Sequence, residues 1–314
     1  MRASHWGEIP ERGSTWAIAL LQLVLRLGGL AVIRVVLAPI AFYYVLTHRI
    51  AREASKDYLL RLNAYCDKRG SPCALRAGWK GIYRHMYSFA LSMAEKHAAW
   101  SGEYSGGNSP RIENPEVSKQ LMYSPTGAVL LVSHLGNFDI AIAVGAFDTD
   151  RRFRVLMDHA GTRRFNRERL TAMQHERIVF YDTGDVGPGT AIELRQAASK
   201  GDVIVIAADR MGASREAWVE VRLLGDETRL PIGPWVIAYL LDCPVYAVFA
   251  CRDGRGYRLI PYKICDRVDL SDRTRRRDTL RIHAQKFADV MQELILRYPE
   301  QWYNFYEYWH PDNR

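Results

Sequence analysis

From about residue 125 onward, short and wholly apolar stretches alternate with segments that repeat their apolar residues at helical spacing. The predicted strands are Ala128–Val132, Phe153–Met157, Ile178–Tyr181, Val203–Ala208 and Val245–Ala250. The predicted helices between them are 138–147, 165–177, 190–200 and 234–241. Continuously apolar strands that alternate with helices are typical of a mainly parallel sheet whose two faces are both covered. We therefore expect an α/β fold.

Three further elements are expected in the C-terminal half. Residues 219–223 and 257–264 are candidates for antiparallel edge strands, and residues 271–297 have the pattern of a long amphipathic helix. The tail 299–309 is strongly aromatic. Its rings are not interleaved with lysines, so core packing or a membrane-interface belt is favoured over a nucleic-acid platform.

The N-terminal part has a different pattern. Residues 16–47 form an apolar run that only Arg26 and Arg34 interrupt. A membrane-spanning helix needs about 20 apolar residues, but this run also contains Pro39. Three interpretations stay open: an interfacial or re-entrant helix pair, a true span, and the buried helical hairpin of a soluble protein.

The next part of the chain is amphipathic and helical. Residues 50–100 form two helical segments that Gly70 and Pro72 separate, and a loop rich in Gly, Ser, Asn and Pro follows up to residue 115. We therefore divide the chain into a membrane-associated segment (1–50), a helical region with its loop (51–115) and an α/β domain (116–314).

Composition narrows the class of protein. The chain has 314 residues, of which 48% are hydrophobic and 25% charged, which is typical of a globular protein. Its net charge of +8 favours anionic partners such as phospholipid headgroups or an acidic carrier protein. The five cysteines are odd in number and form no C-x-x-C pair, which argues against a disulfide framework or zinc site and favours a reducing compartment. The first fifteen residues lack the pattern of a cleaved signal peptide.

The strongest chemical motif follows the first predicted strand. It reads Ser133-His134-Leu-Gly136-Asn137-Phe-Asp139 and opens a helical segment. Ligands of open α/β sheets bind at the carboxyl ends of the strands, so His134 is expected there, with Asp139 one helical turn further on. An aspartate that bonds to one ring nitrogen makes the other a better base, and such a pair can deprotonate a hydroxyl or amine acceptor. The alternative is a loop histidine with Asp139 as a helix-capping acid.

Three further features of the sequence contain arginine. Asp209 and Arg210 follow the strand 203–208 and are expected at the same edge, where Arg210 can hold a phosphate or an acyl carbonyl, or form a structural ion pair. Arg164 belongs to an arginine cluster that either binds phosphate or forms a solvated helix face. The arginines at 273–277 are expected to be surface, facing a membrane or carrier protein.

A competing hypothesis starts from Asp148-Thr-Asp150. This D-x-D motif is used by glycosyltransferases to hold a divalent metal and a sugar nucleotide, although aspartate is common in such helix-to-strand loops. A third hypothesis is a membrane-binding module without catalytic activity, in which loss of His134 has no effect.

The motif His134-Leu-Gly-Asn-Phe-Asp139 resembles the H-x4-D/E block of the lysophospholipid acyltransferase superfamily, and most of all the late acyltransferases of lipid A biosynthesis. Further blocks agree in order. These are Asp209-Arg210-Met-Gly, Leu230-Pro-Ile-Gly-Pro-Trp, Cys243-Pro-Val and Tyr298-Pro-Glu-Gln-Trp302. The arginine-proline pair usual after the second strand is missing, and Asp139 replaces the more usual glutamate. The resemblance therefore indicates a divergent branch.

The resemblance implies a glycerolipid acyltransferase-like fold and acyl transfer from acyl-CoA or acyl carrier protein to a lipid or amphiphilic acceptor. It implies that His134 acts as general base and that Asp139 orients it, and it implies no metal or redox cofactor. Backbone N–H groups near Gly136 and Asn137, or an arginine, are expected to stabilise the oxyanion. The implied location is the cytoplasmic side of the cell inner membrane, with an anionic membrane surface and no nucleic acid as partner. Lysophospholipid, glycolipid, amino-acid lipid and polyene-type pigment precursors stay open as acceptors.

Overall fold

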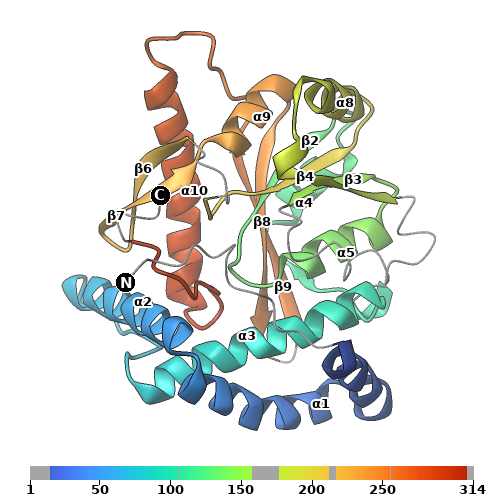
Figure 1. The fold of residues 1–314 in the computed structure, drawn as a ribbon. Helices are drawn as coiled ribbons and strands as arrows, with labels where there is room; N and C mark the ends of the chain where they lie inside the picture. The colour runs from blue at the N-terminus through green and yellow to red at the C-terminus, as the bar shows by residue number, and fades with distance from the viewer. Residues whose placement is uncertain (1–14, 105, 158–176, 212–216, 255, 310–314) are drawn as a thin grey trace.

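A computed structural model describes residues 15–104, 106–157, 177–211, 217–254 and 256–309. Its centre is a seven-stranded sheet with the order β1-β9-β8-β2-β5-β3-β4 (Figure 1). The strands are β1 (Arg111–Ile112), β2 (Ala128–Val132), β3 (Phe153–Met157), β4 (Ile178–Asp182), β5 (Val203–Ala207), β8 (Val245–Asp253) and β9 (Gly256–Cys265). Strands β8, β2, β5, β3 and β4 run parallel, whereas β9 runs antiparallel to β8. The expected α/β fold with a mostly parallel sheet is confirmed.

Helices cover both faces of this sheet. The helices that follow the N-terminal region are α4 (Pro115–Tyr123), α5 (Phe138–Asp148), α8 (Pro188–Ser199), α9 (Gly233–Leu241) and α10 (Arg276–Arg297), and short 3-10 turns lie at Gly106–Asn108 and Thr183–Asp185. Successive side chains of β2 alternate between two cores: Leu131 packs in the core that includes α9 and α10, and Leu130 in the core with α5. Burial on both faces explains why the strand sequences are apolar throughout.

Three sequence-based expectations differ from the structure. Residues 219–223 do not join the main sheet: β6 (Trp218–Leu223) pairs with β7 (Asp226–Pro231) in a separate antiparallel ribbon that packs on α10. Strand β9 is antiparallel as expected, but β1 lies outside it at the edge. The long helix begins at Arg276 and not at residue 271.

The helix predicted at 165–177 lies, apart from Arg177, outside the described residues. The alternation of apolar and polar residues did not show which sheet β6 joins, because it has a period of two residues both in a two-stranded ribbon and in the edge strand of a larger sheet.

The N-terminal helices form a layer at one end of the sheet (Figure 1). They are α1 (Thr15–Thr47), α2 (Arg49–Lys68) and α3 (Trp79–Trp100). Helix α1 is broken at Gly29, whose φ of 62° is unfavourable for other residues, and its second half packs on α3. The helical layer lies at the carboxyl end of β2. Asn137, five residues beyond β2, donates a side-chain hydrogen bond to the carbonyl of Ser92 on α3 (2.9 Å).

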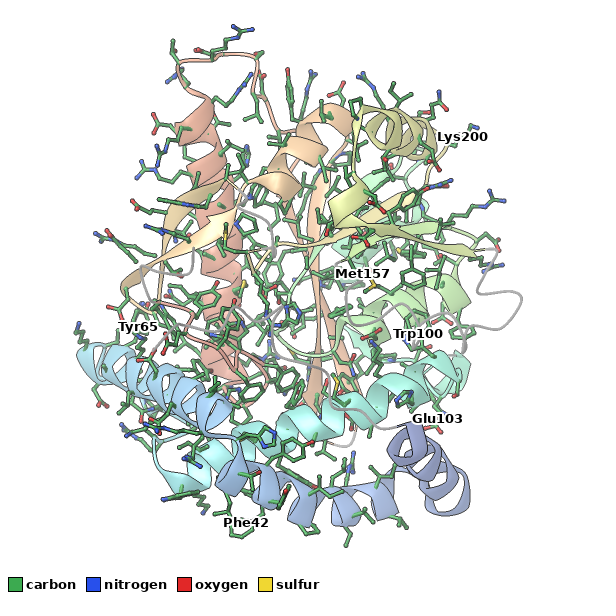
Figure 2. All side chains as sticks on the ribbon, in the orientation of Figure 1. Phe42, Tyr65, Trp100, Glu103, Met157 and Lys200 are labelled. Atoms are coloured by element: carbon green, nitrogen blue, oxygen red, sulfur yellow. The ribbon has the colours of Figure 1, made fainter. Side chains whose placement is uncertain are left out.

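This layer leaves apolar side chains exposed. Residues Ile33, Leu37, Ala41 and Val45 of α1 are buried, whereas Val35 (73% exposed) and Phe42 lie on the outer face. Figure 2 shows Phe42 on the side of α1 that faces away from the sheet. Among the described helices none is by itself long and apolar enough to cross a bilayer, but the pair Val32–Thr47 and Arg49–Lys68, bent by 94°, meets the criterion of length and composition.

Candidate active site

The pair His134 and Asp209 lies at the carboxyl edge of the sheet. Strands β2 and β5 are parallel neighbours with Val132 opposite Ala207, so the residues that follow each strand by two positions meet. Asp209 is fully buried, and its Oδ1 lies 3.0 Å from Nδ1 of His134. Its Oδ2 accepts a hydrogen bond from the backbone N–H of His134 (2.8 Å). The ring of His134 is therefore held in one orientation.

The electrostatics of this pair favour a neutral imidazole beside an ionised carboxylate. Burial lowers the pKa of His134 below its usual value, and the positive charge of Arg210 lowers it further, against the opposing effect of the Asp209 and Asp139 carboxylates. Burial by itself raises the pKa of Asp209, but His134 and Arg210 lower it by more. A neutral ring whose Nδ1–H donates to Asp209 carries its lone pair on Nε2.

The position of Nε2 suits a base. The side chain of His134 is 30% exposed, and no group in the described ranges hydrogen-bonds to Nε2. A neutral, oriented and partly exposed imidazole at a sheet edge has the properties of a general base.

Asp139 has different partners from those expected. It is 5% exposed, its Oδ2 lies 3.2 Å from Nζ of Lys96, and its Oδ1 accepts a hydrogen bond from Nε1 of Trp100 (3.0 Å). The ring of His134 therefore donates to Asp209 and not, as predicted, to Asp139. The reason is geometric: Asp139 lies in the first turn of α5 and faces α3, whereas the ring of His134 faces the neighbouring strand.

Gly136 and Asn137 do not offer free donors to an oxyanion. The N–H of Gly136 donates to the carbonyl of Gln301 and the N–H of Asn137 to that of Ala250, both at 2.8 Å. Gly136 has a φ of +77°, and a Cβ there would lie 2.2 Å from the oxygen of Ala250. The motif needs glycine because the turn passes close to β8. Of the expected oxyanion donors, these two N–H groups are engaged, and an arginine is left as the alternative.

Arg210 lies where the sequence predicted, next to the His134–Asp209 pair. Its guanidinium donates to the carbonyl of Tyr303 and lies 5.4 Å from the ring centroid of Tyr306. Because its charge lowers the pKa of His134, Arg210 acts electrostatically on that ring. Arg164 lies outside the described residues.

Sequence reasoning missed the part that the C-terminal tail takes in this site. The tail forms a β-bridge from Trp302 to Leu135, and Tyr303 donates its N–H to the carbonyl of His134 (2.9 Å). The hydroxyl of Tyr308 donates to the carbonyl of Asp209 (3.0 Å). The Pro-Glu-Gln-Trp block was a signal for this segment, but periodicity does not say where a tail packs.

A buried charge cluster beside the tail was also missed. Glu95 on α3 is 1% exposed and pairs with Arg252 at the end of β8 (2.6 Å), and the hydroxyl of Tyr257 donates to the same carboxylate (2.6 Å). Arg34 on α1 lies 3.8 Å from Glu95. The only sequence signal was three consecutive ionisable residues, Glu95-Lys-His97, near the end of an amphipathic helix.

The aspartates of the glycosyltransferase hypothesis lie elsewhere. Asp148 and Asp150 precede β3 and so lie at the amino edge of the sheet, opposite His134. Asp150 pairs with Arg177 (2.9 Å), and Asp148 accepts a hydrogen bond from Ser109 (2.8 Å). Both line a cavity of about 690 Å³, which extends to Lys200 (labelled in Figure 2). This geometry separates them from the histidine site.

Comparison with known proteins agrees with the site at His134. A search of the curated proteins gives no match. The sequence model described as "Bacterial lipid A biosynthesis acyltransferase" matches residues 93–310, which include the His134 motif, Asp209, Arg210 and the tail to Trp309. The match covers more than half of the chain. The chain therefore belongs to the bacterial lipid A biosynthesis acyltransferase family, and it is an acyltransferase of lipid biosynthesis with a lipid acceptor.

Proposed function

We propose that the protein transfers a fatty acyl group from a thioester, acyl-CoA or acyl carrier protein, to a hydroxyl or amine of a lipid or amphiphilic acceptor. The observation that carries this proposal is the His134–Asp209 pair. It presents a neutral and partly exposed imidazole at the carboxyl edge of the sheet, beside the positive charge of Arg210. The reaction needs a base and electrostatic stabilisation, and the thioester itself supplies the activated acyl group.

In the proposed reaction His134 first takes a proton and later returns it. Nε2 of His134 takes the proton of the acceptor hydroxyl or amine while the acceptor attacks the thioester carbonyl. The tetrahedral intermediate then expels the thiolate, which takes the proton back from His134 and leaves as a free thiol. Asp209 remains ionised and stabilises the imidazolium. Arg210 is the candidate for stabilising the oxyanion, because the N–H groups of Gly136 and Asn137 are engaged.

We further propose that the enzyme lies on the membrane with its α1–α3 layer against the lipid. The inner stripe of α1 packs along α3, and the hydroxyl of Tyr87 on α3 donates to the carbonyl of Arg34 on α1 (2.7 Å). A helix held lengthwise in this way places its apolar outer face, with Val35 and Phe42, parallel to the protein surface. Such a face suits insertion into the headgroup region better than a crossing of the bilayer.

The cytoplasmic side of the inner membrane fits the donor and the cysteines. Acyl-CoA and acyl carrier protein are cytoplasmic thioesters. All five cysteines are free thiols, which is typical of a reducing compartment. The active-site edge and the apolar layer lie at the same end of the sheet, so a lipid acceptor reaches His134 from the bilayer.

The test is an acyl-transfer assay with labelled palmitoyl-CoA and palmitoyl-carrier protein as donors. The acceptor is a polar lipid extract of bacterial inner membrane, and the metal chelator EDTA is added in a parallel sample. We expect labelled lipid with the wild type, with or without EDTA, and a loss of about 10²–10⁴-fold with His134→Ala. His283→Ala is the matched control, because His283 on α10 stacks on Trp235 of α9, away from this edge. A His134→Ala variant with unchanged melting temperature and near-normal rate refutes the mechanism.

A further inference from the structure

The C-terminal tail hydrogen-bonds to each residue of the proposed site, although these residues follow two different strands. It bonds to the backbone of the loop after β2 at both sides of Leu135, through Gly136 N–H to Gln301 O and Tyr303 N–H to His134 O. On the other strand it accepts the guanidinium of Arg210 at the carbonyl of Tyr303. The separation between His134 and Arg210 is therefore fixed through Tyr303.

The tail is in turn held from the opposite side by the helical layer. His85 on α3 is fully buried, and its Nε2 lies 2.8 Å from the carbonyl oxygen of Trp302. Its Nδ1 lies 2.9 Å from Oγ of Ser55 on α2. Burial lowers the pKa of His85 to about 4, so the ring is neutral near pH 7. In a neutral ring that donates from Nε2, Nδ1 is an acceptor, so Ser55 donates to it.

The hydrogen bond from His85 is directed at the residue that forms the β-bridge to the catalytic loop. Trp302 pairs with Leu135, the residue after His134. A second hydrogen bond from the same layer runs from the hydroxyl of Tyr58 on α2 to the carbonyl of Pro299 (2.7 Å), before the bridge begins. Both donors are buried. Of these two, the one from His85 reaches the backbone of the segment that contacts His134.

We propose that His85, oriented by Ser55, is a positioning residue of this enzyme: it fixes the carbonyl of Trp302 and thereby sets the separation of His134 and Arg210 through the C-terminal tail. The proposal rests on the proposed function of His134. Ser55, Tyr58 and His85 lie before residue 93, outside the part of the chain that the family model matches. The helical layer that bears the exposed apolar face thus also fixes the separation of His134 and Arg210.

The test compares variants of the full-length protein with the acyl-transfer assay above. His85→Phe keeps a ring of similar shape against Phe305 (4.6 Å between centroids) but removes the donor. We expect kcat to fall by about 10- to 100-fold, because a displacement of the order of 1 Å at a reacting group has that effect. His85→Gln retains an N–H donor and is expected to recover most of the rate.

The pH profile separates positioning from mere stability. His134 faces Asp209, Arg210 and Asp139, of which Arg210 lowers its pKa. If the tail loosens, Arg210 moves away and water enters, so the pKa of His134 rises. The acid limb of kcat/KM then moves to higher pH in His85→Phe.

Tyr58→Phe is the matched control, because it removes one buried hydrogen bond to the same tail outside the bridge. It is expected to lower the melting temperature without moving the acid limb. The proposal is overturned if His85→Phe changes only the melting temperature, or if Tyr58→Phe and His85→Phe have equal effects on kcat and on the pH profile. Absence of acyl transfer by the wild type would instead refute the proposed function.

Discussion

The exchange of Asp209 for asparagine tests which carboxylate orients His134. The family motif points to Asp139, whereas the hydrogen bonds point to Asp209. Asp209 uses its two oxygens for two donors, the backbone N–H and the ring Nδ1–H of His134. Asparagine has one oxygen and one NH₂ group. The backbone N–H of His134 can only donate, so it bonds to the side-chain oxygen of the asparagine. The NH₂ group of the asparagine then faces Nδ1.

An NH₂ group at Nδ1 selects the wrong tautomer. Nδ1 must then accept a hydrogen bond, so the ring proton moves to Nε2. Nε2 can then no longer take the proton of the acyl acceptor. A neutral side chain also no longer stabilises the imidazolium. By comparison with the loss of an orienting aspartate in other acyl-transfer enzymes, we expect Asp209→Asn to lower kcat by about 10³–10⁴-fold, or about 4–5 kcal/mol.

Asp139→Asn is the contrasting variant. It keeps an oxygen for Trp100 but removes the charge that pairs with Lys96. We expect a lower melting temperature, with a stability loss of about 3 kcal/mol, and a kcat within about ten-fold of wild type in the folded fraction. Both variants are measured by single-turnover acyl transfer and by thermal unfolding. The reasoning is refuted if Asp139→Asn abolishes turnover at unchanged stability while Asp209→Asn stays active.

The remaining predictions concern Arg210, His85 and the outer face of α1. Arg210→Lys keeps the charge but loses the bidentate hydrogen bonding of the guanidinium. Turnover should therefore fall by about ten-fold while the acid limb of kcat/KM stays in place. Arg210→Gln should instead raise the pKa of His134 and move that limb to higher pH, and an unchanged limb would contradict the electrostatic effect. The unfolded state binds more protons at His85 between pH 6.5 and about 4, so wild-type stability should fall by about 3 kcal/mol as pH drops through that window. In His85→Gln, the free energy of unfolding measured with urea should depend less on pH over that window. Val35→Asp with Phe42→Asp should weaken sedimentation with anionic phospholipid vesicles by at least about ten-fold, and full retention would contradict contact through α1.

Much of the fold could be predicted from the sequence, for a physical reason. Strands buried on both faces must be apolar at each position, so β2, β5 and β8 were recognisable as runs. Parallel strands share their carboxyl ends, so the sequence also predicted that His134 and Asp209 lie at the same edge. The ribbon of β6 and β7 was not predicted, because its pattern has the same period as an edge strand.

The details of the site were decided by the tertiary structure. The sequence determined that His134 stands at a strand end next to a glycine turn, since both follow from local pattern. It did not determine that Asp209 and not Asp139 bonds to the ring, because that depends on the one-to-one register of β2 with β5 and on the direction in which α5 leaves the sheet. The contact of Trp302 with Leu135 joins residues that are 167 positions apart. Local periodicity carries no information about such pairs, and only the packing of the tail between α3 and the catalytic loop brings them together.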